Sequence, residues 1–477
     1  MSGSPSEQMK FYRFRSVQAL LDWGEIEDEY IYLSPKDDLN DPQEGYLNLV
    51  FQGDRIVWSN FFKNYIFSLY SVWLKLILSG EEHTKEMLED DIYVSFDPAL
   101  KDGMSRNYNW IYPKLCRMFF KESVIQKLIK SLSTHEKKFS QSELVPLMFY
   151  AHVVLLQKLI CLSIRHGIIS PKPISALILD YVCSVKFAKK QIKSISEIIK
   201  NNKGKRRILN KKNKQINRII SKGSNELGEM IVSPVNKNLD ILIKFSKIYI
   251  NKLTQLVSPD CYVASFATGY SNPLMWAHYG DSGKGACLIF TLDFKEGDSP
   301  YLLPQKENSR KIKCDRLKMR KVKYIKTLGE RGNFNFFSNL CSRGELFLKQ
   351  WFYLDDAKSN MIEKHWSFKK NGKKKYIKKI YRALRNKYKQ YDYEDEYRTV
   401  ILSFNRDDYV RKEISKWKYK FDNLTGIIFG VRTEEKIKSE IIRIINDKCK
   451  KYKIKNFNFY QAIDDNEGEI KIGKISL

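Results

Sequence analysis

The stretch CYVASFATGYSNPLMWAHYGDSGKGACLIFTLDF (261–294) carries most of the fold information. Its two ends, CYVASFA and GACLIFTLDF, are rich in aromatic and branched residues and predict strands. Between them, NPLMWAHYGDSGKG predicts a short helix and then a glycine-rich turn. Further strands are predicted at 396–404 and 424–430, and an amphipathic helix at 431–452.

The rest of the chain separates into strand-like ends and a helical middle. FYRFRS (11–16) alternates aromatic and basic residues, which predicts a strand. The region from 61 to 256 has helical spacing and ends in a basic tail. We therefore expect an α+β protein with a mixed, mainly antiparallel β core built from both ends of the chain, and a large α-helical insertion. The expected parts are 1–60, 61–256, and 257–477 with a basic insertion at 305–390.

The net charge of +29 is concentrated in three windows. Residues 186–224 contain 14 Lys or Arg and one acid, 305–326 contain 10 and two, and 364–390 contain 12 and none. A surplus confined to segments is typical of a surface that neutralises phosphates, so we expect a nucleic acid, RNA in particular, as partner. The alternative is a set of solvated faces or loops. The cations we single out are Lys205, Arg206, Arg207, Lys373, Lys374 and Lys375.

Polar and apolar patterning gives expectations about location. The opening MSGSPSEQMK is polar, and the longest apolar run, 144–156, is 13 residues long and contains His152. We therefore expect no secretory signal and no membrane span, and the run reads as a core helix. The eight cysteines form no CxxC pair. They are expected to be reduced thiols of a cytoplasmic protein, and no metal site is expected.

Three motif clusters lie in the β-rich parts. The first is Tyr12, Arg13 and Arg15, followed by the loop SPKDDLNDPQEG (34–45). The second is SFATGYSNPLMWAHYGDSGKGACLIF (265–290), and the third is YEDEYRTVI (393–401). Together they resemble a widespread bacterial domain of unknown function with the hallmarks NDPxE-G, SFx…MWxHYxD…GxC and ExEYR. The resemblance covers roughly 9–50 and 258–446, and it implies a setting in genomic islands linked to phage defence.

The order of these clusters is also similar to that of ADP-ribosyltransferases. Cleavage of the glycosidic bond of NAD passes through an oxocarbenium-like state, which needs a carboxylate, a cation and an aromatic surface. The resemblance implies Glu396 at the ribose 2′-hydroxyl, with Glu394 orienting or deprotonating the acceptor. It implies Arg13 or Arg15 at the pyrophosphate or ribose, and Ser265 beside the glutamate or ribose. Trp276 or Tyr279 would stack on nicotinamide, and His278 beside the glycine-rich turn joins the catalytic candidates. NAD is then a substrate and no metal is required.

Each of these residues also has a purely structural interpretation. Arg13 and Arg15 could be surface residues of an edge strand, and Asn40–Asp41–Pro42 could form only a turn. Trp276 could belong to the core, and Glu396 could form only a salt bridge with Arg398. The turn at 280–285 could hold a phosphate through backbone N–H groups, although it fits no Walker or dinucleotide pattern.

Two other functions compete with group transfer. In a nuclease, His278, Asp281, Glu394 and Glu396 would form a metal or general-base site beside a basic surface. In a non-catalytic module, lysines interleaved with aromatic residues at 366–388 would bind nucleic acid without chemistry. A self-harmful enzyme of this charge would also need restraint, so we expect an acidic, antitoxin-like protein partner.

Overall fold

The computed structural model describes most of the chain, in two compact units. The described residues are 6–41, 44, 47–78, 92, 110–134, 138–169, 185–201, 207, 208, 210–212, 214, 215, 218, 240–295, 300–302, 317–327, 333–340, 345–364, 372–403, 415–465 and 468–476. The first unit consists of Met1–Leu47, Pro259–Gly332 and Lys378–Leu477. The second consists of Asn48–Ser258 and Asn333–Ile377.

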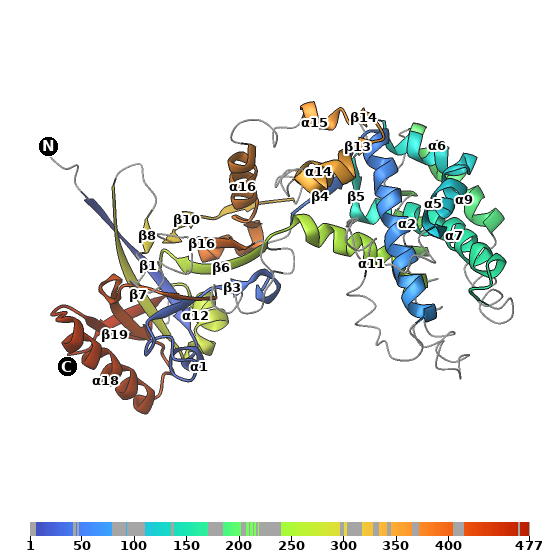
Figure 1. The fold of residues 1–477 in the computed structure, drawn as a ribbon. Coiled ribbons are helices and arrows are strands. Elements are labelled where there is room, and N and C mark those ends of the chain that lie inside the picture. The colour runs from blue at the N-terminus through green and yellow to red at the C-terminus, as the bar shows by residue number, and fades with distance from the viewer. Residues whose placement is uncertain are drawn as a thin grey trace. The chain divides into compact units, whose positions relative to one another are not determined.

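A nine-stranded sheet organises the described part of the first unit (Figure 1). Its order is β10–β16–β6–β1–β7–β18–β19–β20, and β3 pairs with β6 outside this path. The strands are β1 (Ser6–Arg15), β3 (Ser34–Pro35), β6 (Asp260–Ala267), β7 (Ala286–Lys295), β10 (Arg320–Lys321), β16 (Glu396–Ser403), β18 (Leu424–Phe429), β19 (Asn458–Asp464) and β20 (Ile470–Lys474). Only β18 and β19 run parallel among these pairs. The expected α+β class with a mainly antiparallel sheet is confirmed.

The motif stretch forms the strand, helix, turn and strand that its pattern predicts. β6 and β7 are joined by helix α12 (Pro273–Tyr279) and a tight turn. Asn272 caps α12, because its side chain accepts a hydrogen bond of 2.9 Å from the N–H of Leu274. Proline then occupies the first turn of the helix, where its missing N–H costs nothing. These signals fix the start of α12 and therefore the place of Tyr279 at its end.

The sheet opens between β1 and β6. These strands pair at Tyr12 and Ala267, whereas the short β3 pairs with β6 at Val263. Arg13 bridges the opening, donating from Nη1 to the carbonyl of Ser265 at 3.2 Å and from Nη2 to the carbonyl of Tyr32 at 2.7 Å. Both carbonyls therefore receive a charge-assisted donor where the ladder between β1 and β6 stops.

Each face of the sheet is covered by a helix from a different part of the chain. The amphipathic helix α18 (Glu435–Tyr452) buries Ile441 and Ile445 in a core that includes Phe11 and Ile427. On the opposite face, α12 buries Met275 and Trp276 in a second core. Because strand residues alternate between faces, neighbouring residues of β1 enter different cores.

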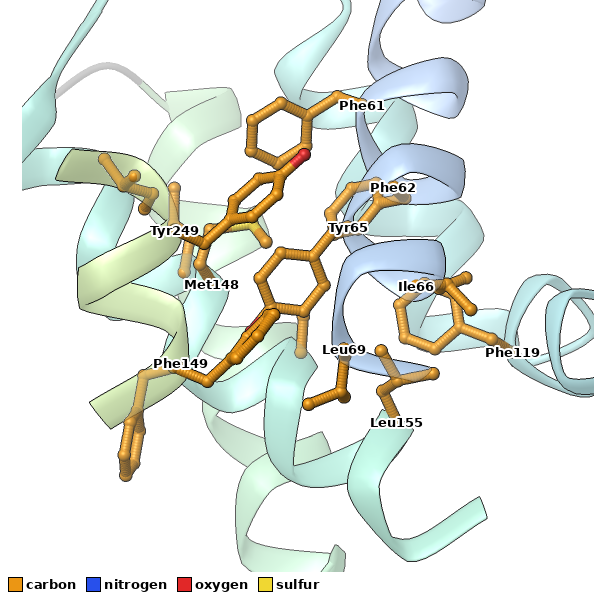
Figure 2. Packing of buried hydrophobic residues seen from close by; sticks show 14 of the residues in the cluster. Phe61, Phe62, Tyr65, Ile66, Leu69, Phe119, Met148, Phe149, Leu155 and Tyr249 are labelled. Carbon is orange, nitrogen blue, oxygen red and sulfur yellow. The ribbon is translucent and has the colours of Figure 1, made fainter. Parts of the chain in front are cut away.

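The second unit is mainly helical. Its helices include α2 (Arg55–Leu78), α5 (Ile111–Phe120), α6 (Ser123–Leu132), α7 (Gln141–Arg165), α9 (Val185–Asn201) and α11 (Asp240–Val257). Figure 2 shows how Phe61, Tyr65 and Leu69 of α2 face Met148 and Leu155 of α7. Tyr65 and Tyr249 form an edge-on aromatic pair with ring centroids 4.9 Å apart, an arrangement aromatic rings favour.

The boundaries of the helical unit differ from those expected. It begins at Asn48 instead of 61, and it also takes up Asn333–Ile377, which we expected in the C-terminal part. The physical reason is a set of long-range contacts. β12 (Phe334–Asn335) pairs in parallel with β4 (Leu49–Phe51), and Asp54 accepts hydrogen bonds of 2.6 Å from the hydroxyl of Ser359 and 2.9 Å from the N–H of Asn360.

The apolar run at 144–156 lies in α7. Among the described helices, α7 is long and apolar enough to cross a membrane, but 78% of its most apolar window is buried inside the protein. His152 within it donates to or accepts from the hydroxyl of Tyr65 at 2.8 Å, and burial lowers its pKa to about 4. The helix therefore has the environment of a core helix in a soluble protein, as expected from its pattern.

Candidate active site

A pocket of about 260 Å³ lies in the first unit where β1 and β6 separate. Its lining comes from all three motif clusters, including Asn40 and Glu44 from the first, Ser265 and Tyr279 from the second, and the glutamates of the third. The volume is just under the range of about 300–1,000 Å³ typical of small-molecule sites. The pocket therefore suits a small molecule or one part of a larger one.

Glu394 and Glu396 enter the pocket from one bend of the chain. Glu394 ends the 3₁₀ helix η9 (Lys389–Glu394), and Glu396 begins β16. Asp395 between them is left-handed, with φ of 36°. Its carboxylate accepts a hydrogen bond from the hydroxyl of Thr268 and pairs with Lys321 at 2.9 Å, which holds this costly conformation in place. Both glutamates consequently line the same pocket.

Lys387 joins the carboxylates of the site. Its Nζ donates to Oε2 of Glu394 at 2.7 Å and lies 3.6 Å from Oε2 of Glu396 and 3.6 Å from Oε2 of Glu44. The side chain is only 3% exposed. The three carboxylates raise the pKa of this lysine, overcoming the opposite effect of its burial. Lys387 is therefore a buried cation at the centre of the cluster.

Arg398 forms a bidentate ion pair with Glu396. Its Nε and Nη2 donate to the two oxygens of Glu396 at 2.9 and 2.6 Å, and its Nη1 pairs with Glu44. Such a bidentate pair fixes the plane of the carboxylate. The salt bridge that the two-residue spacing allowed therefore forms, and it lies inside a pocket wall. It orients Glu396 without removing it from the lining.

Tyr279 holds the first glutamate. Its hydroxyl donates to Oε1 of Glu394 at 2.8 Å and accepts a hydrogen bond from the side-chain amide of Asn40. The carbonyl of that amide is 3.5 Å from Nζ of Lys387. The NDPQE loop is therefore more than a turn, because Asn40 and Glu44 both contact charged or catalytic candidates in the pocket.

The two glutamates have opposite electrostatic environments. Burial raises the pKa of Glu394, and the neighbouring Lys387 only partly offsets this. Burial would also raise the pKa of Glu396, but Arg398 and Lys387 lower it overall, helped by the Ser265 hydroxyl. Among the described residues of the cluster, three carboxylates face two cations. Two carboxylates whose pKa values are shifted in opposite directions can take different roles in acid–base chemistry.

The two arginines of β1 do not offer free cations to the pocket. Arg13 is buried, and both of its terminal nitrogens bind backbone carbonyls, while burial lowers its pKa to about 10. Arg15 forms a bidentate ion pair with buried Glu25, including a bond of 2.8 Å from its Nε. Both line the pocket. Their observed contacts are structural, so the sequence-based assignment to a pyrophosphate is not supported by their hydrogen bonding.

Of the two remaining candidates in the second cluster, Ser265 lies in the pocket and Trp276 lies in the core. Ser265 is exposed in the pocket wall, and its hydroxyl is bonded to Glu396. Trp276 is 4% exposed, packs edge-on against Phe14 at 5.0 Å, and donates from Nε1 to the carbonyl of Tyr270 at 2.8 Å. It therefore belongs to the core, which leaves Tyr279 as the aromatic candidate of this cluster in the pocket lining, together with Tyr12, Phe14 and Phe266.

His278 does not join the two glutamates. It is exposed beside Tyr393, with ring centroids 6.4 Å apart, and it is not part of the pocket lining. No group of three or more His, Cys, Asp and Glu side chains arranged to hold a metal occurs among the residues that the structure describes. The four residues expected of a nuclease, which also include Asp281, are therefore not brought together.

The glycine-rich turn has a packing function. The N–H groups of Gly283, Lys284 and Gly285 are bonded to carbonyls within the turn itself. A Cβ at Gly285 would lie 2.1 Å from the carbonyl oxygen of Arg15, and one at Gly430 would lie 2.3 Å from that of Gly283. These glycines allow three backbone segments to touch. Those N–H groups are consequently not directed at a phosphate.

The basic candidates can be placed only in part. Arg207 and Lys374 are exposed on helical segments. Lys205 and Arg206 lie outside the described residues, and the side chains of Lys373 and Lys375 are likewise not described.

Two residues of the site, Glu44 and Lys387, were missed from the sequence, and Arg398 was considered only as a salt-bridge partner of Glu396. Glu44 and Arg398 are hallmark positions of the NDPxE and ExEYR motifs, so the resemblance itself contained a signal for them. Lys387 lies in the basic window 364–390 and looked like part of a charged surface. Its burial in β15 (Asn386–Tyr388), where the side chain is only 3% exposed, shows that it points inward.

Comparisons with known proteins found no match. No family model, no curated protein and no solved structure matches the chain.

Proposed function

We propose that the chain is an ADP-ribosyltransferase-like enzyme that cleaves the bond between nicotinamide and ribose in NAD within this pocket. The observation that carries the proposal is the convergence of Glu394 and Glu396 on Lys387, at 2.7 and 3.6 Å, in one small pocket. The cluster has one more carboxylate than it has cations. It would therefore favour a group that becomes positively charged, as ribose does when the glycosidic bond breaks.

The reaction assigns a separate role to each glutamate. The C1′–N1 bond breaks, and its electron pair neutralises the nicotinamide ring nitrogen. Glu396, held ionised by Arg398, faces the developing charge on the ribose. The acceptor hydroxyl forms the new bond to C1′ and gives its proton to Glu394, whose raised pKa suits a base. Nicotinamide, the ADP-ribosylated acceptor and a proton leave.

Tyr279 and the pocket size agree with this substrate. The Tyr279 ring lies in the lining and its hydroxyl orients the proposed base. A volume of about 260 Å³ accommodates the nicotinamide-ribose half, and the adenosine half would extend outside. Arg13 then acts as a positioning residue that keeps β1 and β6 at the separation that forms the pocket.

The acceptor and setting belong to the same proposal. The segmental surplus of positive charge favours a nucleic acid, with RNA as the first choice. We further propose a cytoplasmic toxin or phage-defence effector restrained by an acidic protein partner, since such chemistry would harm its own cell.

The test uses NAD labelled in its adenylate phosphate, incubated with the full chain and total RNA. Label should appear in RNA with wild-type protein and fall by at least about 100-fold with Glu396→Gln. Lys389→Gln, on the exposed surface near the site, is the matched control and should retain transfer. Equal labelling by wild type and Glu396→Gln would contradict the proposal. If the label appears in protein instead of RNA, the proposed reaction stands and its acceptor is a protein.

A further inference from the structure

Helix α9 of the helical unit has two distinct faces. Ala188, Ile192, Ile195 and Ile199 are buried in the core of that unit. The opposite face carries Lys186, Lys190, Lys193, Glu197 and Lys200, all exposed and spaced along one helical stripe. The first three form a like-charge series in which each lysine is three or four residues from the next. Such spacing opposes helix formation, so folding alone does not favour it.

A neighbouring acid, Glu122, is already paired. Glu122 pairs with Lys158 of α7 at 2.5 Å and with Lys189 of α9 at 2.7 Å. Burial acts to raise the pKa of this carboxyl, but the two lysines lower it overall. Among the described residues, no carboxylate forms an ion pair with Lys186, Lys190 or Lys193. This end of α9 therefore keeps its positive charge.

A second basic stripe lies against the first. Residues 207, 208, 210–212, 214, 215 and 218 are helical, and Lys212 donates from Nζ to the side chain of Gln191 in α9. On the same segment Arg207, Lys211, Lys214 and Arg218 are exposed, again with a spacing of three or four residues. The sequence contains no acidic residue from 198 to 225. Lys186, Lys190, Lys193 and these four residues together supply seven exposed cations.

An exposed aromatic ring accompanies the lysines. Phe187 is 41% exposed between Lys186 and Lys190, and its ring contacts Tyr150 edge-on at 6.3 Å. A fixed aromatic face beside cations is the combination that binds unpaired bases and phosphates together. A duplex offers phosphates but keeps its bases stacked inside.

We propose that α9 and the described helical residues between 207 and 218 form a binding surface for single-stranded nucleic acid, in which Lys186, Lys190, Lys193 and the second stripe neutralise phosphates and Phe187 stacks on a base. The role of this surface in holding the acceptor rests on the proposed function. Its binding of nucleic acid is tested without NAD, so the binding surface and the proposed enzymatic function can fail separately.

The experiment measures binding of the full chain to a fluorescent 20-nucleotide single strand of mixed sequence, as RNA and as DNA, over a range of KCl concentrations. If all seven cations neutralise phosphates, the slope of log K against log[KCl] is about −5. The combined variant Lys186→Gln, Lys190→Gln, Lys193→Gln should make the slope less steep by about 2. Phe187→Leu should weaken binding of the single strand and leave binding of a duplex unchanged.

The matched control removes three exposed cations from α18, where acids balance them. It is Lys436→Gln, Arg443→Gln, Lys450→Gln, and Arg443 already pairs with Asp447 at 3.8 Å. Its slope should equal that of wild type. An unchanged slope for the α9 variant, an equal loss in the α18 control, or tighter binding of duplex than of single strand would overturn the proposal. The α9 variant should also keep its thermal unfolding midpoint.

Discussion

Tyr279 and Glu394, 115 residues apart in the chain, are joined by a hydrogen bond of 2.8 Å from Oη to Oε1. The bond connects the end of α12 to the bend before β16, and Asn40 completes it from the N-terminal loop. One contact thus unites all three motif clusters. If the pocket is catalytic, this contact orients the carboxylate that accepts a proton.

Replacing Tyr279 by Phe tests that role. Loss of one hydrogen bond should lower the free energy of unfolding by about 1 kcal/mol, and nicotinamide release should fall at least about tenfold. The hydroxyl also helps to lower the pKa of Glu394, so its removal should move the acidic limb of the rate profile to higher pH. Tyr397→Phe, on the opposite face of β16, is the control and should leave that limb in place.

Replacing Lys387 by Gln tests whether this lysine of the basic window is structural. It would leave three carboxylates facing one cation in a buried cluster, and breaking such a pair costs about 3–5 kcal/mol. Lys389→Gln, two residues away and exposed, should change stability by less than about 0.5 kcal/mol. Denaturant unfolding measures both. Equal small effects would show that Lys387 points to solvent.

The two glutamates should give stability profiles of opposite sign. The raised pKa of Glu394 favours its protonated form in the folded state, so its contribution is present below about 4.5 and is lost as pH rises through the raised value. Glu394→Gln, which mimics the protonated form, should therefore gain stability relative to wild type as pH increases. The lowered pKa of Glu396 has the opposite effect, because it favours the ionised form in the folded state. Glu396→Gln should be less stable at neutral pH, and the difference should shrink as pH falls through the lowered value. Parallel profiles for the two variants would contradict these environments.

Gly285→Ala should be strongly destabilising. The new Cβ would lie 2.1 Å from a backbone oxygen of β1, which cannot move without disturbing the sheet. A loss of at least about 2 kcal/mol is expected. Gly269→Ala is the control, because nothing lies within 4 Å of its added Cβ. Thermal unfolding of the two variants distinguishes packing at the turn from a general intolerance of alanine.

The strands and the helix of the motif stretch could be predicted because their local signals agree with their environment. Asn272 and Pro273 mark the start of α12, and alternation marks β16. The place of residues 333–377 could not be predicted in this way. It depends on the pairing of β12 with β4 and on the bonds of Asp54, which join residues 285 and 305 positions apart in the chain.

The site shows the same division between local and long-range information. Glu394, Glu396 and Tyr279 were predictable from residue type and motif order. The direction of Lys387 was not, because a lysine among lysines looks exposed until Glu44, Glu394 and Glu396 are placed around it. The ion pair of Arg15 was not predictable for a related reason, since its partner Glu25 carries no motif signal.

Release of nicotinamide from NAD labelled in that ring measures the proposed bond cleavage most directly. The wild-type chain should release labelled nicotinamide, and Glu394→Gln and Glu396→Gln should each reduce the rate by at least about 100-fold while remaining folded by circular dichroism. Lys389→Gln should release it at the wild-type rate. Failure of the folded wild-type protein to release nicotinamide with total RNA or cell protein present as acceptor, or release at the same rate by all four proteins, would contradict the assignment of this pocket to NAD.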